Sequence, residues 1–405
     1  MGGGLAGLAA HHELGKKGYS VITLEASSIP GGRVRTEKLR SAFSDTGAQF
    51  FTYNYPRILK LITELNLKAH PASSLMGQKE KGRDFVIETK NPLSSFASGL
   101  LSFTSWLVLF KHILKLKINC RWIHPEDPVR LSHFDDTDAR TYCLEYLNQE
   151  ILDKIFIPYF SAFNYAPPEE LSSALVIRAL LHMASGRPLM GLEGGLATLP
   201  YALSQEKEIF YDTIVERIDG NIVFTKNGEF EASHIIIATT AKIARELLRN
   251  NFPEGLNTKM GPSVHEGILV KKKERKATYG TLVSPDRSPD FNVLTNERMK
   301  SPGLSPEEFD LFGILRSREG AMKNEVTGAE DLLEISGEEI IARKTTRWME
   351  AIPVLSPGHL KAVTAYRNTL SKNSQVLLAG DYLSTGCAEG AIESGQFIAG
   401  IFPMK

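Results

Sequence analysis

Hydrophobic and polar residues alternate along this chain with two periods, one typical of helices and one typical of buried strands. Over 5–17 apolar residues recur with the helical period, and Gly18 follows as a C-terminal cap. Runs rich in Val, Ile and Leu, typical of buried strands, lie at 20–25, 209–218, 233–239 and 376–381. A helix rich in small residues is expected from residue 388 onward. This pattern predicts an α/β fold with a parallel sheet.

The stretch between 55 and 190 is dominated by helical patterns. Residues 91–110 carry no charge, but serines and Pro92 interrupt the run, so we do not expect it to cross a membrane. Residues 111–118 mix lysines with apolar residues, as an interfacial helix does. Two interpretations of 91–118 stay open: a buried helix pair over a substrate funnel, or a peripheral membrane contact. Further helices are predicted at 151–165 and 171–186.

The stretch 261–345 is expected to be rich in strands, with one helix near its end. The strands are predicted at 265–272, 279–283, 292–295 and 311–316, and the helix at 334–343. A chain of 405 residues exceeds what one hydrophobic core usually supports. We therefore expect a second lobe, of α+β type, built around this sheet.

Composition and charge exclude some classes of function. The charges of Lys and Arg balance those of Asp and Glu, which gives no support for a nucleic-acid partner. The three cysteines, Cys120, Cys143 and Cys387, form neither a disulfide framework nor a zinc pattern. We therefore expect no metal and a cytoplasmic location, with membrane association through 91–118 as the open alternative.

The first residues carry the strongest local motif. Gly2, Gly4 and Gly7 fit G-x-G-x-x-G, and Glu25 follows at the spacing of a carboxylate that binds a ribose hydroxyl. Gly2 permits a tight turn, Gly4 lets the backbone approach a pyrophosphate, and Gly7 lets the following helix pack closely on the sheet. The motif predicts a Rossmann-like dinucleotide-binding domain.

A buried strand normally precedes such glycines, and in this sequence they follow Met1 directly. We therefore expect the first strand of the Rossmann-like domain to be missing from this chain. A start placed too late in the reading frame accounts for this better than decay of the gene, because the later motifs are intact. A chain that binds a flavin without turning over a substrate stays the alternative.

The segment after Glu25 resembles a known family. The run L-E-A-x-x-x-P-G-G-R, which contains Gly32 and Arg33, resembles the FAD-binding amino end of the flavin amine oxidase superfamily. That superfamily includes monoamine oxidases, protoporphyrinogen oxidases and phytoene desaturases. The resemblance implies FAD as the cofactor, with Arg33 near its diphosphate or ring. It also implies that the turn at Gly47 and Ala48 passes close to the flavin.

The resemblance continues near the carboxyl end. It implies that the backbone of Val215 meets the adenine and that Gly380 and Asp381 bind the ribityl or diphosphate region. It also implies that the helix containing Ala391 and Ile392 points its N-terminus at the flavin. There the helix dipole stabilises the negative charge of the reduced ring. The domains are expected at 1–54, 190–260 and 345–405 for FAD binding, 55–189 for the helical part of the substrate domain and 261–344 for its strand-rich part.

The substrate is less defined by the sequence. The segment 347–359 resembles the protoporphyrinogen oxidase form R-W-x-x-A-x-P, with Leu355 in place of a usual tyrosine and Trp348 expected beside the substrate cavity or in the core. The candidates for a lysine near the flavin are Lys271, Lys272 and Lys273, a run more typical of a solvated strand end. We therefore expect hydride removal from a large apolar substrate, a porphyrinogen before a phytoene-like polyprenoid, and an amine last.

Overall fold

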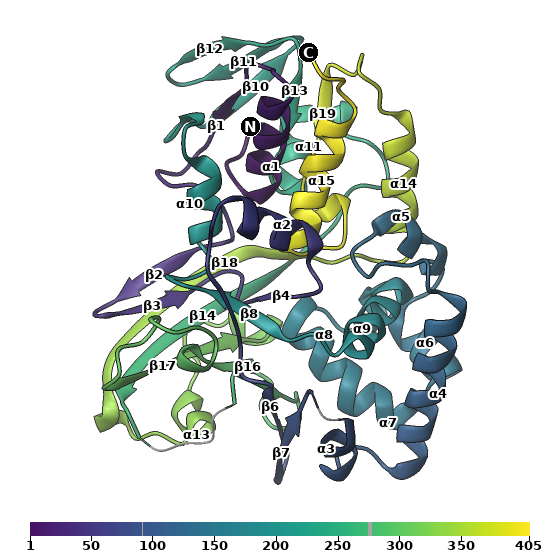
Figure 1. Cartoon of the computed structure of the whole chain (residues 1–405), viewed down its shortest axis with the longest axis vertical. Coiled ribbons are helices and arrows are strands. Elements are labelled where there is room, and N and C mark those ends of the chain that lie inside the picture. Colours follow the sequence, from purple (N-terminus) through teal and green to yellow (C-terminus); the bar gives the residue numbers. More distant parts are fainter. Residues whose placement is uncertain (91, 274–277) are drawn as a thin grey trace.

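The computed structural model describes residues 1–90, 92–273 and 278–405. The molecule is elongated, with an upper and a lower part in the view of Figure 1. Segments from the beginning, the middle and the end of the sequence meet in the upper part, which also holds both termini. They include α1 (Leu5–Lys16), β13 (Ile235–Ile237) and α15 (Ala388–Gly400).

Two parallel strand pairs form the sheet of the upper part. β1 (Ile22–Leu24) pairs with β9 (Glu208–Phe210), and β13 pairs with β19 (Val376–Leu378). Met1 and Gly2 lie between the two pairs. The Met1 amine donates to the Ile236 oxygen over 2.7 Å, and the Gly2 N–H donates to the Leu24 oxygen over 2.8 Å. The strands predicted within 20–25, 233–239 and 376–381 are confirmed.

The single strand predicted over 209–218 is wrong, because the structure has two strands there. β9 ends at Phe210, and β10 (Val215–Asp219) belongs to a separate antiparallel sheet with β11 (Ile222–Thr225) and β12 (Gly228–Glu231). Between the two strands, Asp212 adopts a positive φ of 51°. Its N–H donates to the Ser27 oxygen over 3.1 Å. The backbone therefore leaves the first sheet and follows the loop after β1 before it enters the second.

The helices α1 and α15 lie side by side and pack closely (Figure 1). A Cβ added at Gly395 of α15 would lie 2.1 Å from the backbone oxygen of Ala6 in α1, so glycine is required for this approach. The neighbouring helices α2 (Pro56–Glu64) and α10 (Thr198–Ser204) contact the same pair.

A seven-stranded sheet, in the order β18-β14-β17-β16-β15-β6-β7, organises the lower part. Its neighbouring strands are antiparallel except β15 and β6, which are parallel. The four strands predicted between 265 and 316 are confirmed as β14, β15, β16 and β17. The bounds are β6 (Leu75–Glu80), β7 (Arg83–Glu88), β14 (Met260–Lys271), β15 (Gly280–Val283), β16 (Phe291–Asn296), β17 (Phe309–Arg316) and β18 (Ile340–Pro353).

The helix predicted over 334–343 is wrong. The segment contains the short 3-10 helix η6 (Gly337–Glu339) and then enters β18, which pairs with β14 over most of its length. Gly337 weakens a helix, and the β-branched pair Ile340 and Ile341 suits a strand. The hairpin of β6 and β7 is a further strand pair, and the helical pattern between 55 and 190 did not predict it.

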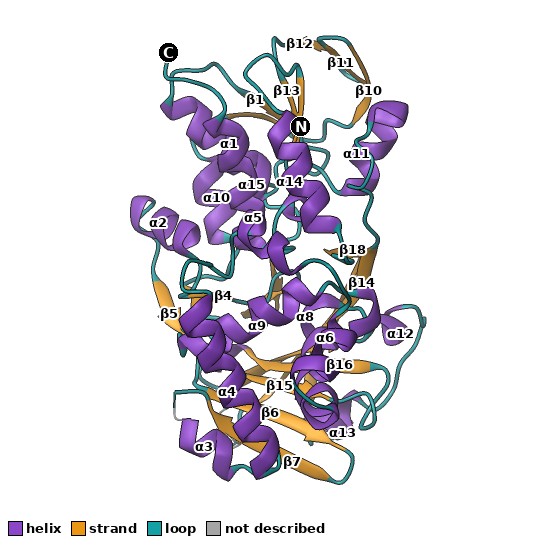
Figure 2. Ribbon diagram, turned by 90° about the vertical axis from the view of Figure 1, so that its right-hand side faces the viewer, coloured by secondary structure: helices purple, strands orange, loops and turns teal. Residues whose placement is uncertain are grey.

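Helices cover one face of this sheet (Figure 2). The contact is made by α8 (Ile157–Asn164), which packs on β15 and β16. Behind it lies α9 (Ser173–Ser185), and the helices predicted at 151–165 and 171–186 are thereby confirmed. On the outside, α4 (Phe103–Asn119) packs on α9. Within the described residues, none of the helices combines the length and the apolarity that crossing a bilayer requires.

Candidate active site

The three glycines of the first motif have different surroundings. Gly2 has a positive φ of 94°, and a Cβ there would lie 2.4 Å from the Ala238 oxygen. A Cβ at Gly7 would lie 1.9 Å from the Gly2 oxygen, so both positions exclude any side chain. A Cβ at Gly4, which caps α1, would have no atom within 4 Å. The backbone N–H groups of the first turn of α1 therefore lie beside open space, which is the arrangement that binds a diphosphate.

Glu25 follows β1 and is 9% exposed. One carboxylate oxygen accepts a hydrogen bond from the Gly3 N–H, and the other accepts from the Ser27 N–H over 2.8 Å and the Ser27 hydroxyl over 2.6 Å. The Glu25 backbone oxygen accepts from the Thr213 N–H over 2.8 Å, two residues before Val215. Glu25 and the segment of Val215 are therefore brought together at one end of the site.

Arg33 and Asp381 form a bidentate ion pair between opposite ends of the chain. Each of the two N–H···O bonds measures 2.7 Å, and the guanidinium also donates to the Ala351 oxygen over 2.8 Å. Burial alone lowers the pKa of Arg33, but the Asp381 carboxylate outweighs it, and the pKa is raised. A Cβ at Gly32 would lie 3.4 Å from the Gly4 Cα, so this pair and the first glycine motif border the same space.

The predicted turn at Gly47 and Ala48 lies against Arg33. A Cβ at Gly47 would lie 1.9 Å from the Arg33 oxygen, and the Ala48 N–H donates to that oxygen over 2.9 Å. Trp348 of β18 holds the same turn, because its indole N–H donates to the Thr46 oxygen over 2.7 Å. Among the described residues, the buried hydroxyl of Thr46 and the buried amide oxygen of Gln49 have no hydrogen-bond partner. Polar atoms of the turn are thus available to a ligand.

A buried lysine also supports this turn, and the sequence analysis missed it. Lys300 is fully buried, and its ammonium lies 2.6 Å from an Asp45 carboxylate oxygen and pairs with Glu297. Burial lowers the pKa of Lys300, but Asp45 and Glu297 outweigh it and raise the pKa. Tyr279 adds a bond from its hydroxyl to the Gln49 oxygen over 2.8 Å. An isolated lysine in a loop carries no sequence signal that would have identified it.

The helix α15 presents its N-terminus to the same region. The Gly380 N–H donates to the Ser394 hydroxyl over 3.1 Å, which fixes the end of β19 against the helix. Ile392 is fully buried, in a cluster that also contains Leu5 of α1, and Ala391 packs against it. The structure therefore places Ala391 and Ile392 in the first turns of α15, between the end of β19 and α1.

A buried acid beside the N-terminal cap of α15 was also missed by the sequence analysis. Glu126 is fully buried and accepts bonds from Arg178 over 2.6 and 3.0 Å and from His182 over 2.6 Å. The thiol of Cys387, which caps α15, lies 3.2 Å from its other oxygen. Burial raises the pKa of Glu126, but the Arg178 guanidinium outweighs it and holds the pKa well below its usual range.

Glu389, the second residue of α15, caps a different helix. Its carboxylate accepts from the Arg57 and Ile58 N–H groups at the start of α2, over 2.8 and 2.9 Å. Burial raises the pKa of Glu389 to about 7. The N-terminus of α15 is thus anchored by two buried acids, Glu126 and Glu389.

Aromatic side chains follow the cofactor turn toward the helical part. Phe50 lies edge-on to Phe163 of α8, with ring centroids 5.6 Å apart, and Tyr159 lies 4.6 Å from Phe163. An apolar cluster continues between α8 and the sheet, formed by Ala162, Tyr165, Val293 and Leu315. The surface that leads away from the turn is therefore apolar and aromatic.

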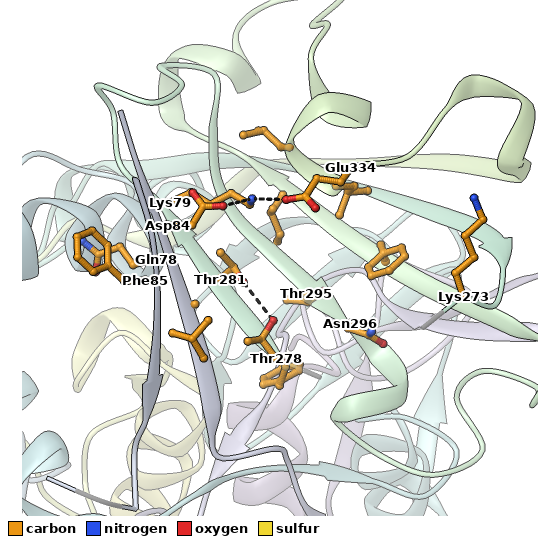
Figure 3. Close-up of a pocket in the computed structure, with 17 residues that line it drawn as sticks. Gln78, Lys79, Asp84, Phe85, Lys273, Thr278, Thr281, Thr295, Asn296 and Glu334 are labelled. Atoms are coloured by element: carbon orange, nitrogen blue, oxygen red, sulfur yellow. Dashed lines mark hydrogen bonds and ion pairs between the residues drawn. The ribbon is translucent and has the colours of Figure 1, made fainter. Parts of the chain in front are cut away.

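A polar cavity of about 490 Å³ lies among β6, β7, β15 and β16 (Figure 3). Lys79 lies between Asp84 and Glu334, at 2.6 and 3.1 Å, and Thr278 and Lys273 also border the cavity. Its lining combines apolar side chains such as Phe85, Leu294 and Phe312 with four charged ones, which are Lys79, Asp84, Lys273 and Glu334. Because of these charges, we do not assign an apolar substrate to this cavity.

The residues present fit FAD. Open space at Gly4 faces the start of α1, the Arg33–Asp381 pair borders it, and the turn of 45–49 offers unpartnered polar atoms. The parallel strands, the helix N-termini and the sheet-based second part define the class of two-lobed FAD-binding oxidoreductases.

The chain belongs to the family described as "Flavin containing amine oxidoreductase", whose sequence model matches residues 5–266. FAD is the cofactor of this family, which confirms the cofactor and the family inferred from the motifs. The individual site residues and the domain boundaries stay predictions.

Three similar proteins illustrate the range of the family. A 15-cis-phytoene desaturase of Glycine max is 24% identical over 332 residues, or 73% of this chain, and the chain spans only 57% of that relative's length. A coproporphyrinogen III oxidase of Mycobacterium bovis is 22% identical over 95% of this chain and 92% of its own. The structure of cyclohexylamine oxidase from Brevibacterium oxydans superposes with a TM-score of 0.76 at 18% identity, covering 98% of this chain and 96% of its own. This last likeness shows a shared fold.

Proposed function

We propose that this protein is an FAD-dependent oxidoreductase that removes hydride from a C–H bond of a large apolar substrate, with a porphyrinogen as the first candidate. The observation that carries the proposal is the aromatic surface of Phe50, Tyr159 and Phe163, which begins directly after the cofactor turn. When bound, FAD supplies a ring nitrogen that accepts the hydride.

The residues of this chain would bind and orient the cofactor. The first turn of α1 beside Gly4 binds the diphosphate, Glu25 binds a ribose hydroxyl, and Arg33 holds Asp381 beside the ribityl chain. The N-terminus of α15 places its dipole and free N–H groups near the ring, where they favour negative charge. Lys300 and Trp348 act as positioning residues, because both hold the turn of 45–49.

A porphyrinogen is favoured over the other substrates by the segment 347–359 and by the relative that aligns over nearly the whole chain. The departure at Leu355 is structural, since Leu355 is fully buried in the core of the helical part. Trp348 lies within the same segment and holds the cofactor turn. The segment thus connects the substrate domain to the cofactor.

A phytoene-like polyprenoid is the second candidate, because the soybean relative covers 73% of the chain and the aromatic surface suits an apolar chain of carbons. An amine ranks last. Lys271, Lys272 and Lys273 are exposed at the end of β14, and Lys273 pairs with Glu339. These lysines therefore lie on a solvated strand end, as the sequence pattern indicated.

Purified protein tests the proposal in two steps. A yellow protein with a flavin absorbance spectrum supports the cofactor site, whereas a colourless one supports a flavin-fold protein without activity. Anaerobic mixing with protoporphyrinogen, phytoene and a panel of amines then measures which substrate bleaches the flavin. Bleaching by amines alone would overturn the order of substrates.

Two variants connect that assay to the aromatic surface. A substrate ring packed on Phe163 gains about 1 kcal/mol, so Phe163→Ala should slow bleaching about fivefold while the flavin spectrum is kept. Phe96→Ala is the matched control, because Phe96 is 46% exposed on α3 (Pro92–Ala97). An equal rate in the two variants would show that the substrate does not use this surface.

A further inference from the structure

The outer face of α4 is apolar where a surface helix is normally polar. Five residues on it, and two aromatic residues beyond its ends, have large exposed fractions. They are Phe103 (62%), Leu107 (52%), Phe110 (67%), Leu114 (47%) and Ile118 (61%), with Phe96 (46%) before the helix and Trp122 (45%) after it. The spacing of four, three, four and four residues places the five on one stripe. We call the five exposed residues of the helix the α4 stripe.

The other side of α4 already has its packing partners. Ser105, Leu109, His112 and Leu116 are buried. His112 lies 3.0 Å from the Tyr142 hydroxyl, and Leu109 and Leu116 belong to the core of the helical part. At 100° per residue this buried side lies opposite the α4 stripe. The stripe is therefore not part of the core of this molecule.

Cations flank the α4 stripe, and the segment that carries it has no acid of its own; from another helix, the Glu150 carboxylate accepts bonds from Ser102 and Ser105 at the start of α4. Lys111 and Lys115 lie along one flank of the helix and Lys117 along the other, all exposed, and Arg121 follows the helix. In the sequence between Glu88 and Glu126 there is no Asp or Glu, although the whole chain has as many acids as cations. The charge of this segment is thus concentrated around an apolar surface.

We infer that α4 lies in the interface of an anionic lipid bilayer, with the α4 stripe in the acyl region and the lysines among the headgroups. Aromatic and aliphatic residues along one face, with lysines beside them, are the composition of helices that lie in membrane interfaces. Trp122 suits the headgroup level, because its indole combines an apolar ring with a donor N–H. The helix has 17 residues and lies along the surface of the molecule, so it would lie parallel to the membrane instead of crossing it.

A second copy of this chain fits the surface less well. A two-fold interface would place the same patch on both sides, and the lysines of one copy would face those of the other. An anionic surface instead neutralises Lys111, Lys115 and Lys117 together and gains about 1 kcal/mol for each. Asn91, the first residue of the span 91–118, lies outside the described residues. This inference goes beyond the proposed oxidation and does not depend on it.

Vesicle binding tests the inference with the FAD-loaded protein. Co-sedimentation is measured with vesicles of phosphatidylcholine alone and with an equimolar mixture of phosphatidylcholine and phosphatidylglycerol. We expect binding to the mixed vesicles, and quenching of Trp122 fluorescence when the lipids carry bromine on their acyl chains. The loss of that quenching in Trp122→Phe would assign it to this residue. Equal binding to both kinds of vesicle would overturn the role of the lysines.

Three variants separate the contributions. Lys111→Gln, Lys115→Gln and Lys117→Gln together should weaken partition into mixed vesicles about 100-fold. Leu107→Gln with Phe110→Gln should weaken it about 100-fold or more. The control exchanges Met322 (67% exposed) and Met404 (70% exposed) for Gln and should leave binding unchanged.

Two further results would overturn the inference. In the first, the parent protein binds neither kind of vesicle. If sedimentation then shows self-association that Leu107→Gln with Phe110→Gln abolishes, the α4 stripe is an interface between copies. In the second, the control and the stripe variants lose binding equally. Flavin content and thermal unfolding, measured on every variant, show that the fold is kept.

Discussion

Replacing Lys300 by methionine should destabilise the protein and loosen its hold on FAD. Lys300, Asp45 and Glu297 are all fully buried, so the exchange leaves two carboxylates in the core without their cation. Breaking a buried ion pair by removing one partner costs about 3–5 kcal/mol. Asp45 begins the turn that lies against Arg33, so the same exchange should weaken cofactor retention.

The size of the effect on thermal unfolding follows from the length of the chain. At about 2.1 cal/mol/K per residue, 405 residues give an unfolding entropy of about 0.85 kcal/mol/K. Cooperative unfolding of Lys300→Met should then occur about 4 to 6 °C below that of the parent. Differential scanning calorimetry measures this shift, and the flavin absorbance of the purified variant measures retention.

Lys79→Met is the matched control. Lys79 also contacts two carboxylates, but the side chains of these partners, Asp84 and Glu334, are 44% and 76% exposed. An exposed ion pair contributes about 1 kcal/mol or less, so the unfolding temperature of this variant should fall by about 1 °C. Because burial raises the pKa of Glu297, lowering the pH should protonate this carboxylate. The difference in unfolding temperature between Lys300→Met and the parent should then become smaller. Equal shifts in Lys300→Met and Lys79→Met would refute the reasoning.

Three further predictions concern the cofactor site. Gly7→Ala should abolish flavin retention, because its Cβ would lie 1.9 Å from a backbone oxygen. Gly15→Ala in the same helix is the control, because its Cβ meets no atom within 4 Å, and it should retain flavin. The flavin absorbance of the two purified variants checks this. Arg33→Lys keeps the charge but loses the bidentate bond to Asp381, so flavin should dissociate about tenfold faster in a dilution assay, and an unchanged rate would separate the pair from the cofactor. Burial raises the pKa of Glu389 from 4.5 to about 7, so the folded state binds the proton more tightly than the unfolded state does. The free energy of unfolding should therefore fall by about 3 kcal/mol as the pH rises from 4.5 through 7. Calorimetry across that range should show a smaller loss for Glu389→Gln, and parallel curves would contradict the assignment.

Local patterns predicted much of the cofactor lobe. The helix over 5–17, the strands within 20–25 and 376–381 and the helix from 388 depend on neighbouring residues in the sequence, and all are present. The same reasoning failed at 334–343, where helical composition competed with a long strand partner. Pairing with β14 decided the outcome there, and β14 lies about 70 residues earlier in the chain.

The supports of the site were beyond prediction for a different physical reason. Lys300 and Glu126 are single polar residues in loops, and a polar loop residue is normally solvated. They became visible only when folding brought Asp45 to Lys300, and Arg178 and Cys387 to Glu126. A glycine motif is recognisable from neighbouring residues, whereas these buried ion pairs depend on a distant partner, 255 residues away for Lys300 and Asp45 and 52 residues away for Arg178 and Glu126.

The bond between Arg33 and Asp381 joins positions 348 residues apart, and this separation constrains how the protein is made. Synthesis at about 5–20 residues per second means that the first half of the pair waits roughly 17 to 70 seconds on the ribosome for the second. During that interval the nascent chain exposes a nucleotide cradle without its closing strand and helix. The complete site can therefore hold the coenzyme only after Asp381 and α15 have been synthesised.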